Sequence, residues 1–66
     1  MESIAQDPGR LLAPPVVLDR TSLSRTTLWR MVRKGEFPKP VQVSPGRIAW
    51  PERAVSAWIA SKLEAA

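Results

Sequence analysis

The stretch SRTTLWRMVRK, residues 24–34, is predicted to form a short helix with two opposite faces. Successive residues of an α-helix are separated by about 100°. One arc of about 140° then holds three guanidiniums, a hydroxyl and an indole, contributed by Arg25, Thr26, Trp29, Arg30 and Arg33. An arc of about 100° on the other side is apolar and holds Leu28, Met31 and Val32. One face is suited to burial and the other to lying against a polyanion.

Cap residues define the ends of this helix, and a second short helix is expected before it. Ser24 can accept a backbone N–H as an N-cap, and Gly35 stands where a left-handed conformation commonly ends a helix. The proline pair at 14–15 suits the first turn of a helix expected over 16–20. Residues 21–23 form the turn between them, so the sequence predicts a helix-turn-helix.

A β-hairpin is predicted after the helix pair. The segment FPKP at 37–40 is not helical, because each proline disfavours helix at the residue before it. Residues 41–43 and 48–50 alternate with period two, and SPGR at 44–47 has turn composition. We expect a four-residue loop, since a two-residue Pro-Gly turn splays hairpin strands. The candidate inward side chains are Val41, Val43, Ile48 and Trp50.

A last helix completes the predicted fold. Pro51 suits its first position, Glu52 is placed well for the helix dipole, and the helix is expected to end near Leu63. The residues expected in the core are Leu28, Val32, Phe37, Trp50, Val55, Trp58 and Ile59.

The length suits one small domain with a flexible start. Residues 1–13 show weak periodicity and a Pro-Gly pair, so we expect a flexible N-terminal tail from which Leu11 and Leu12 can dock on the core. Residues 14–66 are expected to form a winged helix-turn-helix DNA-binding domain, mainly α with a small β-hairpin.

Composition argues against several function classes. The chain has no cysteine and no histidine, so neither a metal site nor histidine-based catalysis is expected. The six acidic residues are scattered, and no activated nucleophile or phosphate-binding glycine loop stands out, so we expect no enzyme activity and no cofactor. No apolar run approaches the ~20 residues of a membrane span, and the start lacks a signal pattern. A cytoplasmic, nucleoid-associated location is the expectation.

Positive charge is concentrated in the middle of the chain. Seven of the ten Lys and Arg residues lie between Arg20 and Arg47, with Glu36 as the one acid there. That segment carries a net charge of +6 and the remainder −2. A positive field on one side of the domain favours nucleic acid as the partner.

Five features of the sequence form a recognisable set: TSLSRTTLWR at 21–30, RKGEFPKP at 33–40, Gly46-Arg47, Trp50 and Trp58. In these features the sequence resembles the AlpA-type phage and prophage regulators over about residues 14–62. These proteins are similar to excisionases (recombination directionality factors) and to the DNA-binding domain of MerR-type regulators. The resemblance implies a winged helix-turn-helix with a recognition helix at 24–34 and a wing over 41–50.

Three positions depart from the pattern of that family. Glycine is usual where Ser22 stands, tyrosine where Trp29 stands, and an acidic residue is common where Val16 stands. The first departure concerns the geometry of the turn, and the second alters a residue that can touch DNA.

The candidate DNA contacts lie on the basic helix and on the hairpin. Arg25 is best placed to read a base edge, because the start of a recognition helix usually enters the major groove. Thr26 suits a contact, whereas Thr27 suits capping. Trp29 can lie along the sugar-phosphate backbone or pack at the core edge. The full set is Ser24, Arg25, Thr26, Thr27, Trp29, Arg30, Arg33, Lys39, Ser44, Gly46 and Arg47.

For each charged candidate the simpler interpretation is a solvated surface. Three arginines on one arc, opposite an apolar arc, favour DNA for the helix. Lys39 and Arg47 flank the hairpin and suit phosphates or a narrow minor groove.

The expected function is sequence-specific binding of double-stranded DNA, with neighbouring copies bound cooperatively and a site-specific integrase as a possible partner. The protein would act as an excisionase or as an AlpA-type transcriptional regulator. The alternative is a protein-interaction adaptor, such as a phage packaging accessory, that uses the helix-turn-helix as a scaffold.

Overall fold

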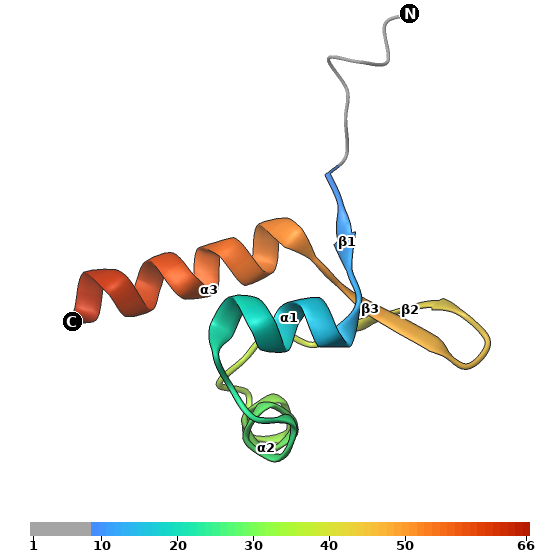
Figure 1. Cartoon of the computed structure of the whole chain (residues 1–66), viewed down its shortest axis with the longest axis horizontal. Helices are drawn as coiled ribbons and strands as arrows, with labels where there is room; N and C mark the ends of the chain where they lie inside the picture. Colours follow the sequence, from blue (N-terminus) through green and yellow to red (C-terminus); the bar gives the residue numbers. More distant parts are fainter. Residues whose placement is uncertain (1–8) are drawn as a thin grey trace, which may run out of the picture.

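A computed structural model describes residues 9–66, which fold into three helices and three short strands (Figure 1). The order is helix, turn, helix, hairpin and helix, preceded by one additional strand. The predicted fold class is therefore confirmed. The elements are β1 (Leu11–Leu12), α1 (Pro14–Thr21), α2 (Arg25–Lys34), β2 (Val41–Ser44), β3 (Arg47–Pro51) and α3 (Glu52–Ala65).

The caps of α2 are those that the sequence predicts. The Ser24 hydroxyl accepts the backbone N–H of Thr27 at 3.2 Å. Gly35 has φ 78°, and its N–H reaches the carbonyls of Met31 and Val32. These contacts satisfy backbone groups that a helix end leaves without partners.

The turn between α1 and α2 places a serine in the left-handed region. Ser22 has φ 62°, and its N–H donates to the Leu18 carbonyl at 2.9 Å. Glycine adopts this conformation without the clash that a Cβ introduces. The departure from the family's glycine at this position therefore leaves the turn formed but strained.

The three strands form one antiparallel sheet with β3 in the centre, in the order β1-β3-β2. Leu11 pairs with Pro51 and Leu12 with Trp50. The expected docking of these leucines on the core is observed for Leu12, which is buried, whereas Leu11 is 53% exposed and is held by the strand pairing. Residues 1–8 of the expected tail lie outside the described residues.

The hairpin turn is shorter than predicted. Ser44 pairs with Arg47, so the loop consists of Pro45 and Gly46 alone. Gly46 has φ 78°, the value of the third residue in a type II turn. Such a turn splays the strands, and the register shift between Gln42 and Ser44 accommodates it as a bulge.

The strand register also decides which hairpin side chains are buried. Val41 pairs with Ala49, so both lie on the face of the sheet opposite Ile48 and Trp50, where Ala49 is buried. Val41 and Val43 are exposed, and predicting them as inward was wrong. Ile48 packs against the core, and Trp50 is fully buried, as predicted.

One core joins every helix to the sheet. Trp50 lies at its centre, with its ring 5.6 Å from Trp29 and 6.2 Å from Phe37 between centroids. The predicted core residues Val32, Trp58 and Ile59 are partly buried and pack against it. The buried residues of the cluster are Leu12, Val17, Leu28, Phe37, Trp50 and Val55.

Candidate nucleic-acid interface

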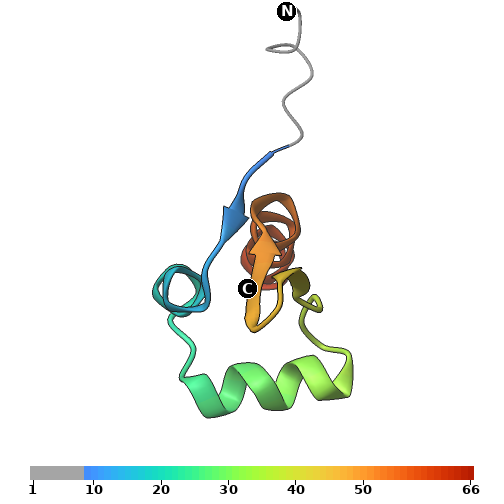
Figure 2. The same ribbon diagram turned by 90° about the vertical axis from the view of Figure 1, so that its right-hand side faces the viewer.

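Helix α2 lies along one side of the described domain (Figure 2), and its basic residues are exposed. Arg25, Arg30 and Arg33 are all exposed, together with Thr26. Within residues 9–66 none of the three guanidiniums forms an ion pair with an acidic side chain. The helix therefore presents positive charge that the described part of the fold does not neutralise.

The opposite face of α2 holds the helix in place. Leu28 is 1% exposed, and Met31 and Val32 pack against the core beside it. Trp29 is half-buried, with its ring tilted against Trp50. Of the two interpretations of Trp29, DNA contact or packing at the core edge, this contact corresponds to packing. It leaves only part of the indole at the surface.

Two hydroxyls at the start of α2 are used within the chain. Ser24 donates its hydroxyl to the Thr27 hydroxyl oxygen at 2.9 Å, in addition to accepting the Thr27 N–H. The Thr27 side chain is also half-buried. Capping is thus the observed role of Ser24 and Thr27, whereas the exposed Thr26 hydroxyl makes no hydrogen bond within the described chain.

The wing presents a second, smaller group of candidates. Ser44, Gly46 and Arg47 are exposed at its turn, and Lys39 is exposed on the segment that leads into it. In Figure 1 the turn projects beyond the body of the domain. The predicted site residues therefore form two groups on separate elements, one on α2 and one on the hairpin.

Two tryptophans fix the segment that links α2 to the wing. The Trp50 indole N–H donates to the Pro38 carbonyl at 2.7 Å, and that of Trp58 donates to the Glu36 carbonyl at 2.9 Å. Phe37 lies between them, with its ring 4.9 Å from that of Trp58. The predicted core role of both tryptophans thus includes setting the position of the wing relative to α2, which the sequence alone did not reveal.

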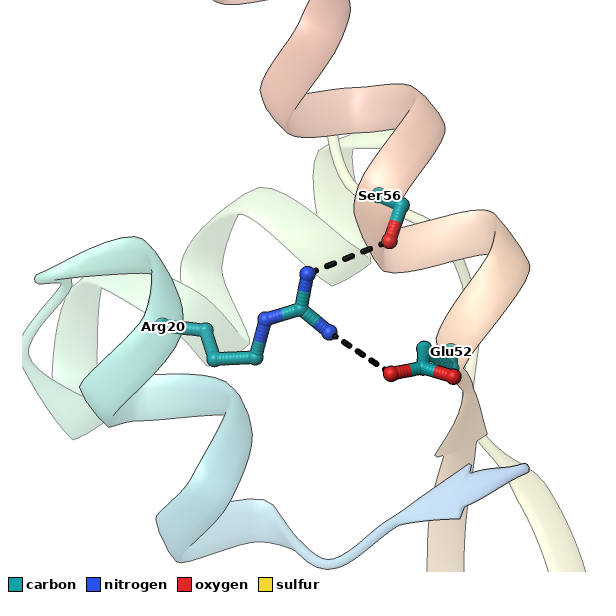
Figure 3. Close-up of polar contacts among 3 residues, drawn as sticks. All are labelled: Arg20, Glu52 and Ser56. Carbon is teal, nitrogen blue, oxygen red and sulfur yellow. Dashed lines mark hydrogen bonds and ion pairs between the residues drawn. The ribbon is translucent and has the colours of Figure 1, made fainter.

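Arg20 is separate from this basic surface. Its guanidinium bridges α1 to α3, 3.4 Å from the Glu52 carboxylate and 3.1 Å from the Ser56 hydroxyl (Figure 3). In the sequence Arg20 belongs to the positive middle segment, but in the structure its charge is paired with the Glu52 carboxylate. The partner lies 32 residues away in the chain, so no local pattern signals the pair.

The amino-acid sequence matches a known protein family. Residues 10–63 match the family described as prophage CP4-57 regulatory protein (AlpA). The chain belongs to the AlpA family. The resemblance seen in the sequence is thereby confirmed, and the family is one of phage-type regulators.

A phage protein is similar to this AlpA-family chain. The uncharacterized protein ORF88 of Enterobacteria phage P4 is 39% identical over 54 residues, which cover 82% of the present chain. The matched region spans 61% of the phage protein. No solved structure gives a significant match. No helix among residues 9–66 has the length and apolar character needed to cross a membrane.

Proposed function

We propose that the protein binds double-stranded DNA sequence-specifically, with α2 in the major groove. The observation that carries the proposal is the row of exposed, unneutralised guanidiniums on a helix whose other face is anchored in the core. A helix of about 11 Å diameter fits the ~12 Å major groove. Arg25 lies at the start of α2, where base edges are usually read, and it is the proposed base reader.

The wing supplies the second contact of the proposal. Arg47 and Lys39 bind the phosphate backbone or a narrow minor groove beside the site of α2. Ser44 and Gly46 at the turn allow close approach of the backbone. Because the indole hydrogen bonds hold the linker, this second contact has a fixed position relative to the first.

A module of this size offers about 600–1,000 Å² of interface, which is small for tight specific binding. We therefore propose that several copies bind neighbouring sites cooperatively and bend or wrap the DNA. Such an array near an attachment site favours excision by a site-specific integrase, and near a promoter it regulates transcription. Family membership supports both forms of this phage-type regulation, and each implies a cytoplasmic, nucleoid-associated location.

Footprinting on the protein's own genomic neighbourhood, with an excision assay beside it, tests the proposal. Protected sites flanking an attachment site, with excision dependent on the protein, would support the recombination role. Protection confined to a promoter would support transcriptional regulation. No protection at any salt concentration would overturn DNA binding and favour a protein-interaction role.

A further inference from the structure

The tip of the wing is a rigid apolar turn. Pro45 and Gly46 form the whole loop between Ser44 and Arg47, and all four residues are exposed. The φ of 78° at Gly46 identifies a type II turn with Pro45 in its second position. The proline ring fixes its own φ and leaves no backbone N–H, so this residue has little conformational freedom to lose on binding and cannot donate to a phosphate. Its chemistry suits an apolar contact.

This turn is an unfavourable choice for the stability of a hairpin. Two-residue hairpin loops prefer type I′ or II′ turns, typically with Asn-Gly, because those turns match the twist of the strands. Here the register shift between Gln42 and Ser44 accommodates the mismatch as a bulge. Locally unfavourable backbone conformations are concentrated at functional sites, and the exposed residue at the second position of this turn is the proline.

The neighbours of Pro45 match the chemistry of the DNA minor groove. Val43, 48% exposed, adds a second apolar side chain near the tip, and Arg47 places a guanidinium directly after the turn. The walls of the minor groove are deoxyribose C–H groups beneath the charged phosphates. Proteins that bind this groove commonly combine a basic side chain with an apolar wedge, proline among them. The end of the wing carries both parts within residues 43–47.

The wing also points in the direction that this contact requires. In Figure 1, α2 is seen end-on and the hairpin of β2 and β3 runs across the view, whereas in Figure 2, α2 runs across the view and the hairpin is foreshortened. The hairpin therefore lies across the axis of α2. Because a helix in the major groove follows that groove, a hairpin across its axis extends over the flanking phosphate strand toward the adjacent minor groove. The indole hydrogen bonds to the Glu36 and Pro38 carbonyls keep this direction fixed.

We propose that Pro45 acts as a wedge that enters this minor groove and partly unstacks one base step, so that a single copy kinks its own site. The inference rests on the proposed function, because α2 in the major groove brings the wing to the step. Wedges of this kind bend duplexes by about 20–90°. Pyrimidine–purine steps such as TA and CA/TG unstack most easily, so the wing selects one of them at a fixed spacing from the bases that Arg25 reads. Arg47 binds the phosphates beside the step.

Bending by a single copy is the direct test. A short duplex with one preferred site carries a fluorescence donor and acceptor at its ends, and energy transfer is measured for the wild type and for Pro45→Asn. This substitution gives the Asn-Gly pair that hairpin loops prefer, so the wing is expected to stay folded while the wedge is lost. The wild type should bend the duplex by about 20° or more, and Pro45→Asn should bind it without this bend. Pro15→Ala, which changes an exposed proline in the first turn of α1, is the matched control and should bend DNA like the wild type.

The salt response separates a lost wedge from a lost wing. Pro45→Asn removes no charge, so the slope of log K against log salt should equal that of the wild type. An unfolded wing would also withdraw Arg47 from the phosphates and lower the slope by about one. If the slope falls, the turn itself has changed, and Pro45→Ala, which removes the ring and leaves Gly46 in place, is measured instead.

A mismatch at the selected pyrimidine–purine step provides the second readout. It unstacks the step in advance, so it should strengthen binding of the wild type by about tenfold and leave that of Pro45→Asn unchanged. A bend that persists in Pro45→Asn, a bend lost equally in Pro15→Ala, or equal strengthening of both proteins by the mismatch overturns the wedge. A wild-type complex on straight DNA defeats this inference alone, whereas the absence of any complex defeats the proposed function with it.

Discussion

The helices α2 and α3 are anchored in the same way but differ in what they present outward. Each contributes one fully buried side chain to the core, Leu28 in α2 and Val55 in α3. A tryptophan also connects each helix to the segment after α2. Trp29 of α2 contacts Trp50, which donates to the Pro38 carbonyl, and Trp58 of α3 donates to the Glu36 carbonyl. Burial therefore does not distinguish a recognition helix from a supporting one.

The difference lies in how the outward charges are partnered. The arginines of α2 have no acidic partner within residues 9–66. On α3, Glu52 pairs with Arg20 of α1, and Lys62 lies over an aromatic ring. Charges that the fold pairs internally stabilise it, whereas charges left at the surface in a row are available to a polyanion. This contrast makes α2 the proposed DNA-binding element.

The largest expected effect tests the shared anchoring. Leu28→Ala should lower the free energy of unfolding by about 2–5 kcal/mol, because it leaves a cavity in a close-packed core. Val55→Ala removes a smaller buried group and should cost about 2 kcal/mol. Chemical denaturation monitored by tryptophan fluorescence measures both. An unchanged midpoint for either variant would contradict the picture of two equally anchored helices.

Arg25→Ala tests the outward difference directly. It should weaken binding to the preferred site by about 1–3 kcal/mol and relax preference at one or two base pairs. Arg20→Ala is the matched control, since it removes a paired arginine, should cost less than about 1 kcal/mol of stability and should keep the preference. Competition binding with single-base variants of the site provides the measurement. If the variant weakened binding equally on every duplex, Arg25 would contact a phosphate rather than a base edge.

Arg47→Ala distinguishes the contribution of the wing to DNA binding from that of α2. It should weaken binding on all duplexes with little change in preferred sequence, and reduce the slope of log K against log salt by about one. The affinity is measured over a salt series for the wild type and the variant. An unchanged slope would show that Arg47 does not contact the DNA phosphates.

The smallest effect concerns the turn that sets α2 against α1. Ser22→Gly should raise the free energy of unfolding by about 0.5–1 kcal/mol, because the left-handed strain outweighs the added backbone entropy of glycine. Sequence preference should stay the same. Thermal unfolding measures the gain, and a lower midpoint would show that Ser22 is not strained in this turn.

Local chemistry explains what could be predicted from the sequence. The limits of α2 follow from Ser24 and Gly35, which act on neighbouring backbone groups, and the apolar face with Leu28 follows from helical periodicity. The family resemblance rested on the same local motifs. The exposure of the arginines on α2 follows from their position opposite that face.

Non-local pairing explains what could not be predicted. β1 consists of two residues and exists because the edge of β3 is available to pair with it. The burial of hairpin residues depends on a register that the bulge beside Val43 alters. Arg20 and the indole N–H groups find partners 12 to 36 residues away in the chain, so no short motif reveals them.

Selection of bound duplexes from a random pool, at low and at moderate salt, tests the central claim most directly. The account predicts enrichment of one defined motif by the wild type, with binding that weakens as salt rises. Recovery of duplexes without a common motif, and with no response to salt, would contradict it.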